Sequence, residues 1–234
     1  MEYTKEDLEN FCNNIWENNL SNNNGGMGAP DLFSFYFTLN KIKPKVVIES
    51  GVWNGISTKL IRKTCPDAII ICLDPREIPY NGYRDDNINT IYYLGNKFID
   101  FKDINLDKYN KKDILCFFDC HQNAYLRLTQ CIEKGITHIF LNDNYPVNCG
   151  SHFTIEHLIH NDKRYYIVND ENKNKMINGM EIYYIFPNIY PGLIKTGEGY
   201  FECKSFLEDD ENDFDIFKIE REKYRWNTYI KLKL

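Results

Sequence analysis

Polar side chains that could do chemistry lie at the ends of two apolar runs of the chain. Asp119 and His121 follow one run, and Asn142 and Asp143 follow the next. Carboxylate and amide oxygens are ligands for a hard divalent cation, and a neutral imidazole can take up a proton. The alternative is that Asp119 and Asp143 only cap loops and that His121 is a surface residue.

A further candidate for ligand binding is the turn that follows the apolar run 46–48. Glu49 precedes Gly51, and Gly55 opens a helical stretch at 57–63. Two glycines between a buried strand and a helix N-terminus let a ligand approach bare backbone. Glu49 sits where a carboxylate can meet a cationic or hydroxylated ligand. An ordinary strand–helix turn without a ligand would also carry such a pair of glycines.

Apolar runs and helical periodicity predict the elements that position these residues. The polar stretch 169–179 is too short for a crossover helix and its loops, so the strands on either side should form an antiparallel pair. Parallel strands end at one edge of a sheet, and a crevice there should bring Glu49, Asp119 and Asp143 together. We expect strands at 46–48, 68–74, 90–94, 113–119, 137–143, 165–168 and 181–186, and helices at 4–20, 31–39, 57–63, 124–134 and 151–160.

Asp74 ends the second of these strands. An acidic residue about 20 residues past a Gly-rich turn is where a ribose is held through its hydroxyls. We therefore expect Asp74 to contact a ribose. The alternative is that its carboxylate only caps the following turn.

The spacing of Glu49, Gly51 and Gly55 resembles motif I of class I S-adenosylmethionine methyltransferases. It looks like the motif of the macrocin-type sugar O-methyltransferases, where a bulky residue such as Trp53 often replaces the central glycine. The resemblance spans residues 45–186. It implies an α/β, Rossmann-like methyltransferase fold: a mostly parallel seven-stranded sheet with one antiparallel strand and helices on both faces. It also implies S-adenosylmethionine as cofactor, bound by Glu49, Gly51, Trp53, Gly55, Asp74 and Asn96.

The same resemblance implies roles for the polar residues. In that family the fourth strand ends in Asp-Gly-Asp and the fifth in Asp-Asp-Tyr, and the outer carboxylates hold a divalent metal. Asp119, Asn142 and Asp143 match the ligands of Mg²⁺ or Mn²⁺, and His121 matches the base. Asn142 replaces a carboxylate and so removes a charge, and His121 replaces an aspartate. Asp119 and His121 are thus the expected catalytic residues, because a metal lowers the pKa of a hydroxyl and an imidazole can take its proton.

The expected function is S-adenosylmethionine-dependent O-methylation of a sugar or a nucleotide-linked sugar. Two other functions stay open. A methyltransferase-like binding module that has lost catalysis is suggested by Asn142. A nicotinamide-dependent oxidoreductase is disfavoured by Trp53, which stands where the dinucleotide fingerprint has its second glycine.

Composition narrows the class of partner. The net charge of −6 disfavours nucleic acid, and no apolar run approaches the roughly 20 residues that span a bilayer. The eight cysteines form no C-x-x-C pair, and the first residues lack the apolar core of a signal peptide, so we expect a cytoplasmic protein. The expected partner is a small-molecule acceptor, and a homo-oligomer stays open.

We expect one structural domain with two additions. Residues 1–40 should form an N-terminal helical segment and lid, residues 41–195 the catalytic core, and residues 196–234 a C-terminal extension. The glycine-rich loop 25–28 is the candidate for a lid that closes over the cofactor, and a plain linker is the alternative.

Overall fold

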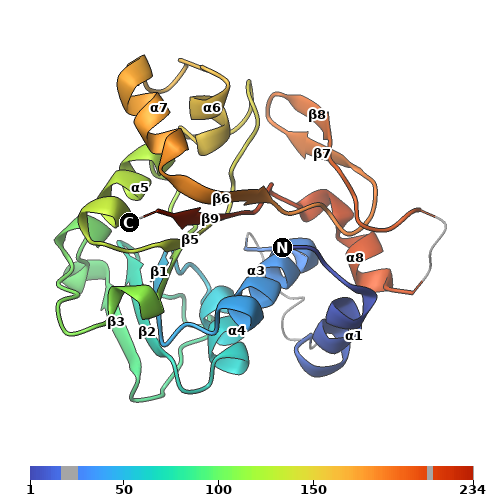
Figure 1. The fold of residues 1–234 in the computed structure, drawn as a ribbon. Helices are drawn as coiled ribbons and strands as arrows, with labels where there is room; N and C mark the ends of the chain where they lie inside the picture. The colour runs from blue at the N-terminus through green and yellow to red at the C-terminus, as the bar shows by residue number, and fades with distance from the viewer. Residues whose placement is uncertain (17–25, 210–212, 234) are drawn as a thin grey trace.

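The computed structural model of the chain describes residues 1–16, 26–209 and 213–233 (Figure 1). A seven-stranded sheet with the order β3-β2-β1-β4-β5-β9-β6 forms its centre. All neighbours are parallel except at β9, which runs antiparallel to both β5 and β6. The predicted Rossmann-like methyltransferase fold is therefore confirmed. The strands are β1 (Val46–Ser50), β2 (Ile69–Asp74), β3 (Thr90–Leu94), β4 (Ile114–Phe118), β5 (His138–Leu141), β6 (Met180–Ile185) and β9 (Thr228–Leu232), with a separate hairpin of β7 (Leu193–Thr196) and β8 (Gly199–Glu202).

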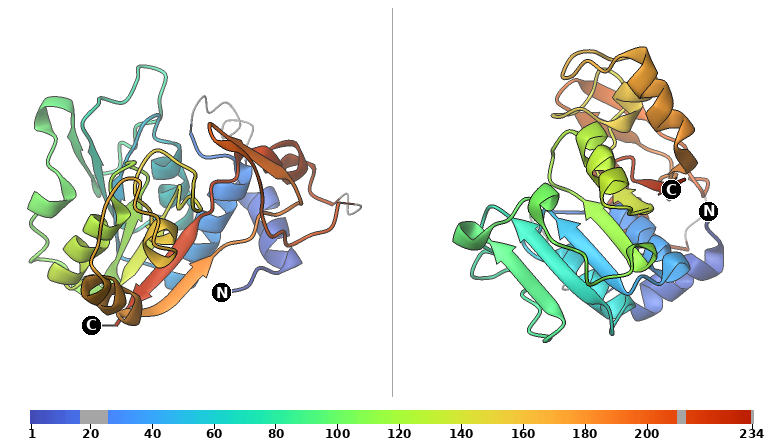
Figure 2. Two further views of the ribbon diagram at one scale, coloured as in Figure 1. Left: turned by 90° about the horizontal axis from the view of Figure 1, so that it is seen from above. Right: turned by 60° about the vertical axis from the view of Figure 1, so that its left-hand side comes forward.

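Helices cover both faces of the sheet (Figure 2). One face packs on α1 (Lys5–Asn14), α3 (Ala29–Ile42), α4 (Ile56–Thr64) and α8 (Asp215–Ile219), and the other on α5 (Ala124–Glu133), α6 (Ile155–Ile159) and α7 (Asp170–Asn178). Successive residues of β1 alternate between the two cores: Val47 belongs to the first, and Val46 and Ile48 to the second. Burial on both faces explains why these strands read as continuous apolar runs. Short 3₁₀ turns complete the elements: η1 (Gly95–Lys97), η2 (Phe101–Asp103), η3 (Lys111–Asp113) and η4 (Arg221–Lys223).

The predicted strand at 165–168 is wrong, and so is its antiparallel pairing with 181–186. Residues 165–168 form no strand, and the segment after them is helix α7, whose first turn is capped by the Asn169 side chain. Tyr165 and Tyr166 mimic a strand in sequence, but their rings pack beside His157 and Phe153 instead. The reversed strand is β9, which comes from the predicted C-terminal extension.

The N-terminal segment lies against the same face as α4. Helix α1 begins at a capping box between Thr4 and Asp7 and ends at Asn14. It is shorter than the predicted helix 4–20, whose residues 17–20 lie outside the described residues. Within the described ranges, no helix combines the length and the apolar character that a membrane span requires.

The register of the sheet aligns the ends of the central strands. Ser50 at the end of β1 pairs with Leu73 of β2 and with Phe118 of β4. Phe118 in turn pairs with Leu141 of β5. The residues that follow these strands, including Asp119 and Asn142, therefore lie along one edge of the sheet.

Candidate active site

The glycine turn between β1 and α4 is shaped by the protein's own backbone. Gly51 has φ 97° and Gly55 has φ 75°, a region that favours glycine. A Cβ on Gly51 would lie 2.3 Å from the carbonyl oxygen of Asp119, and one on Gly55 would lie 2.1 Å from that of Tyr83. The close approach that the glycines allow is therefore made by neighbouring chain segments.

Gly51→Ala should lower the free energy of unfolding by about 1–3 kcal/mol, because alanine is strained at positive φ. The contact of its methyl group with the Asp119 carbonyl should add to this loss. Urea denaturation measures this. Gly197→Ala is the matched control, since a Cβ there has no heavy atom within 4 Å. Equal stability of the two variants would contradict the proposed backbone contact.

Glu49 does not join the crevice that the sequence analysis predicted for it. Its carboxylate is buried under the first turn of α4, where it accepts hydrogen bonds from Thr58 Oγ1 at 2.6 Å, from Ser57 Oγ and from Cys72 Sγ at 3.2 Å. Burial raises the pKa of Glu49 to about 7, although these hydrogen bonds oppose the shift. Because successive residues of a strand point to opposite faces, Glu49 holds α4 in place while its neighbour Ser50 borders a cavity.

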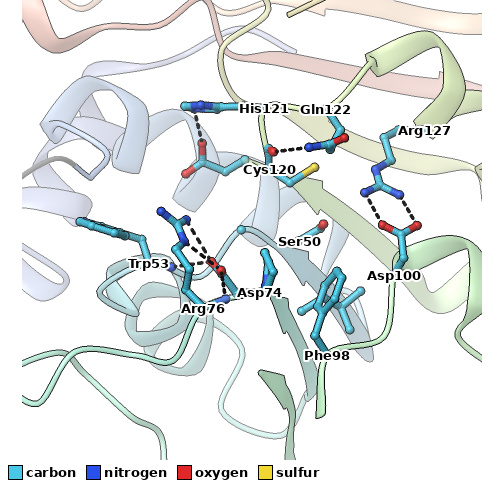
Figure 3. Close-up of a pocket in the computed structure, with 14 residues that line it drawn as sticks. Ser50, Trp53, Asp74, Arg76, Phe98, Asp100, Cys120, His121, Gln122 and Arg127 are labelled. Atoms are coloured by element: carbon cyan, nitrogen blue, oxygen red, sulfur yellow. Dashed lines mark hydrogen bonds and ion pairs between the residues drawn. The ribbon is translucent and has the colours of Figure 1, made fainter. Parts of the chain in front are cut away.

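Asp74 ends β2 with both carboxylate oxygens engaged. Oδ2 accepts hydrogen bonds from the backbone amides of Val52 at 2.9 Å and Trp53 at 3.1 Å, and Oδ1 accepts from Arg76 Nε at 3.1 Å. Burial raises the pKa of Asp74, but the hydrogen bonds from Arg76 and the turn amides outweigh it, and the pKa is lowered. The Arg76 guanidinium also lies 4.7 Å from the centre of the Trp53 ring (Figure 3). Asp74 thus links the glycine turn to an exposed arginine.

A cavity of about 630 Å³ opens above these residues (Figure 3). Its volume falls within the range of small-molecule sites. Of the residues predicted to bind a cofactor, Gly51, Trp53 and Asp74 line this cavity, whereas Glu49, Gly55 and Asn96 do not, and Asn96 is exposed. The residues that line it without having been predicted are Ser50, Leu73, Pro75, Arg76, Phe98, Asp100, Cys120, Gln122 and Arg127.

The predicted catalytic residues come together at the edge of this cavity. His121 Nε2 lies 2.8 Å from Asp143 Oδ2 and 3.9 Å from Asp119 Oδ1. Asn142 Nδ2 donates to Asp119 Oδ1 at 3.1 Å. His121 and Asp143 both have positive φ, at 51° and 58°, a strained backbone conformation that clusters at functional sites. His152 stacks on the His121 ring, with centroids 5.6 Å apart.

The electrostatics of this cluster shift the pKa values of its two carboxylates, Asp119 and Asp143, in opposite directions. Burial, and then the charge of Asp143, raise the pKa of Asp119 to about 7. The hydrogen bond to Asp143 raises the pKa of His121, although burial opposes it. Burial also raises the pKa of Asp143, but the bond from His121 outweighs this and lowers it. Burial lowers the pKa of His152 to about 4, so this ring is neutral beside His121.

The donor set fits a divalent cation. One carboxylate oxygen of Asp119 and one of Asp143 lie within 4.8 Å of each other, and both lie within that distance of a ring nitrogen of His121. Ligands on opposite sides of such an ion are about 4–5 Å apart, because each bond is about 2.0–2.6 Å long. Asn142 Oδ1 is buried and has no hydrogen-bond partner among the described residues, so an amide oxygen is left over for a cation.

A second cavity of about 310 Å³ is also lined by residues of this cluster. Asp119 and His121 line both cavities. Gly26 and Met27, from the part of the predicted lid loop that is described, also border the second cavity, whereas Gly25 lies outside the described residues. Its remaining lining residues are Asp31, Asn142, Asp143, Tyr145, Lys223 and Arg225.

Sequence reasoning missed the residues that come to these cavities from elements far away in the chain. Asp31 lies in the first turn of α3 and Arg225 precedes β9, and their sequence spacing to the glycine turn carries no signal. Arg76 could have been found, because it lies two residues after Asp74 in the same turn. The stretch 223–226 is basic and aromatic, a pattern that predicts no role by itself.

Comparisons with known proteins give similar solved structures only. No protein-family model and no curated protein sequence matches the chain. An O-methyltransferase from Bacillus cereus in complex with SAH is similar at 9% identity with a TM-score of 0.47, over 98% of each chain. A putative O-methyltransferase from Klebsiella pneumoniae has 9% identity and a TM-score of 0.49, over 99% of this chain and 98% of the other. The O-methyltransferase TomG from Streptomyces achromogenes, in complex with SAM, has 9% identity and a TM-score of 0.48, over 99% and 97%.

Proposed function

We propose that this protein is an S-adenosylmethionine-dependent O-methyltransferase. The observation that supports this most directly is the pair of cavities that meet at Asp119 and His121. A transferase must bring two reactants together across one reacting centre. The cavity beside the glycine turn is the cofactor site in this proposal, and the cavity beside Asp31 is the acceptor site.

In the first cavity, the chain's own residues suit the cofactor. Phe98 and the exposed part of Trp53 offer apolar surface, and Asp119 offers a carboxylate that can face a sulfonium or an ammonium group. Bound S-adenosylmethionine supplies an electrophilic methyl group. Asp74 can accept a ribose hydroxyl only after the Arg76 side chain turns away, which its exposure allows.

In the second cavity, His121 is the proposed base for the acceptor hydroxyl. Its Nε2 is held by Asp143, which leaves Nδ1 to accept the proton. Asp143 then stabilises the imidazolium that forms, as a carboxylate does beside a catalytic histidine. Asp119, Asn142 and Asp143 are the residues that would hold Mg²⁺ or Mn²⁺, and such an ion would lower the pKa of the acceptor hydroxyl. A sugar or nucleotide-linked sugar is the acceptor proposed from the resemblance of the glycine turn.

The turn geometry disfavours a nicotinamide dinucleotide. In dinucleotide-binding folds, the pyrophosphate lies against backbone amides at the glycine turn. Here the amides of Val52 and Trp53 already donate to the Asp74 carboxylate, whose negative charge would repel a phosphate. The turn therefore favours a cofactor without a pyrophosphate.

Isothermal titration tests the cofactor site. S-adenosylmethionine should bind the wild-type protein, NAD⁺ should not, and Asp74→Asn should weaken binding. Arg76→Ala should bind the cofactor as tightly as wild type or up to about fivefold more tightly, because it removes a partner that competes for Asp74 through an exposed ion pair. Arg84→Ala is the control, since Arg84 is exposed and lies outside both cavities. Binding that is lost in Arg76→Ala would contradict the competition, and absent binding in wild type would contradict the function.

A further inference from the structure

Arg225 lines the second cavity. Hydrogen bonds hold it in place and still leave two of its guanidinium nitrogens available as donors. Its backbone amide donates to Asp31 Oδ1 at 3.0 Å, and its Nη1 donates to the carbonyl oxygens of Glu222 at 2.9 Å and Tyr224 at 2.8 Å. Its Nε and Nη2 have no hydrogen-bond partner among residues 1–16, 26–209 and 213–233. These two nitrogens form one edge of the guanidinium, the geometry that binds a carboxylate or a phosphate through two parallel bonds.

The neighbouring lysine differs, because its charge is already compensated. Lys223 Nζ lies 2.7 Å from Glu220 Oε1, and Glu220 Oε2 accepts the Ala29 backbone amide at 2.7 Å. Glu220 therefore ties Lys223 to the beginning of α3. No carboxylate of the described residues forms an ion pair with the Arg225 guanidinium within 4.0 Å. The Nε and Nη2 donors of Arg225 are thus left for a ligand.

The acidic side chain of Asp31, which lines the same cavity, does not fill this role. Asp31 is buried, and its Oδ1 accepts hydrogen bonds from the backbone of Arg225 and from Asn227 Nδ2 at 3.0 Å. Its Oδ2 has no partner within the described part of the chain. Asp31 therefore fixes the backbone of residue 225 and leaves the guanidinium edge open on the cavity that both residues line.

We propose that the methyl acceptor carries an acidic group, a phosphate or a carboxylate, and that this group binds the Nε and Nη2 edge of Arg225. The acceptor hydroxyl would then lie at Asp119 and His121, which line the same cavity. This inference rests on the proposed function, because that function makes the second cavity the acceptor site. Phosphorylated and nucleotide-linked sugars carry the first kind of acidic group, and uronic acids carry the second.

Three probes distinguish recognition of an acidic group from recognition of the sugar itself: glucose 1-phosphate, glucuronate and the neutral methyl glucoside. Each is titrated at millimolar concentration into the full chain with S-adenosylhomocysteine and EDTA, so that no divalent cation binds the anion. At least one anion should bind more tightly than the neutral sugar, and which one binds identifies the acidic group. Arg225→Gln should weaken that binding about 10- to 100-fold, as expected for charge-assisted hydrogen bonds. Arg225→Lys should lose part of it, because lysine keeps the charge but lacks the fork.

Arg84→Gln is the matched control, with the same change of charge at an exposed arginine outside both cavities, and it should bind the anion like wild type. Circular dichroism and thermal melting establish that each variant folds, and the comparison of charged and neutral sugars on wild type needs no variant. Equal affinity for neutral and charged sugars, absence of anion binding, or unchanged binding in folded Arg225→Gln would overturn the inference. S-adenosylmethionine titrated into the same proteins distinguishes the failures, because loss of cofactor binding in wild type refutes the methyltransferase function and not the anion site.

Discussion

Replacing His121 by alanine should lower kcat about 10²–10⁴-fold, the usual contribution of a general base. The affinity for S-adenosylmethionine should stay nearly unchanged, because the proton is taken from the acceptor and Asp74 and the glycine turn remain intact. Single-turnover kinetics measure the chemical step, and calorimetric titration measures cofactor binding. His160→Ala is the control, since His160 is an exposed histidine that pairs with Glu156 outside both cavities.

The pH dependence gives this prediction a second readout. His121 must be neutral to act as base, so turnover is present above its pKa and is lost as the pH falls through it. The hydrogen bond to Asp143 raises the pKa of His121, and the acid limb should therefore lie above the value of about 6.5 for an unperturbed histidine. In the metal-free protein, NMR titration should show a lower pKa for His121 in Asp143→Asn than in the wild type, because the substitution removes the carboxylate that raises it. If His121→Ala kept near-normal kcat with the same acid limb, His121 would be the surface residue of the alternative interpretation.

Removing divalent cations should abolish turnover and leave cofactor binding nearly intact, because the proposed ion serves the acceptor hydroxyl. Turnover in excess EDTA, followed by restoration with Mg²⁺ or Mn²⁺, measures this. Mn²⁺ binding, followed by electron paramagnetic resonance, gives a readout that needs no acceptor. Asp119→Asn should weaken Mn²⁺ binding at least about tenfold, since even residues that only support metal ligands contribute about 10- to 100-fold.

Protons and the cation compete for the Asp119 carboxylate, so metal binding should depend on pH. Burial and Asp143 raise the pKa of Asp119 to about 7, and a protonated carboxyl cannot ligate a cation well. Mn²⁺ should therefore bind with full affinity above pH 7 and progressively more weakly below it. Asp103→Asn, at an exposed carboxylate outside the cavities, should leave binding unchanged. Full activity in excess EDTA, or pH-independent Mn²⁺ binding, would rule out this role.

Strands β1, β2, β4 and β5 were predictable because they are largely buried on both faces and read as apolar runs. The edge strand β3 is only partly buried, and its β-branched and aromatic residues made it predictable. Strand β9 was not, since Thr228–Leu232 includes a lysine and its identity depends on pairing with β5 and β6. The strand prediction for the segment 165–168 failed for the opposite reason. Its aromatic and β-branched residues suit a strand, but they pack beside α6 and no strand pairs with them.

The residues of the site also divide into those that the sequence predicts and those that it does not. The gathering of Asp119, His121, Asn142 and Asp143 followed from one rule, that parallel strands end at one edge of the sheet. The direction of Glu49 did not follow from that rule, because it depends on which face of β1 meets α4. The segment that leads into β9 brings Arg225 to the second cavity, and no local sequence pattern predicts such a contact.

The position of β9 also bears on the order in which the protein can be made and folded. The strand that completes the sheet is the last of its seven strands to be synthesised, and its place is between β5 and β6. Until residues 228–232 emerge, the β5 edge that later pairs with β9 is open. An open strand edge is a template for pairing with other chains. After β6 is complete and before β9 closes the gap, the growing chain therefore has two strands, β5 and β6, whose shared partner is still missing, and both are open to pairing with other chains.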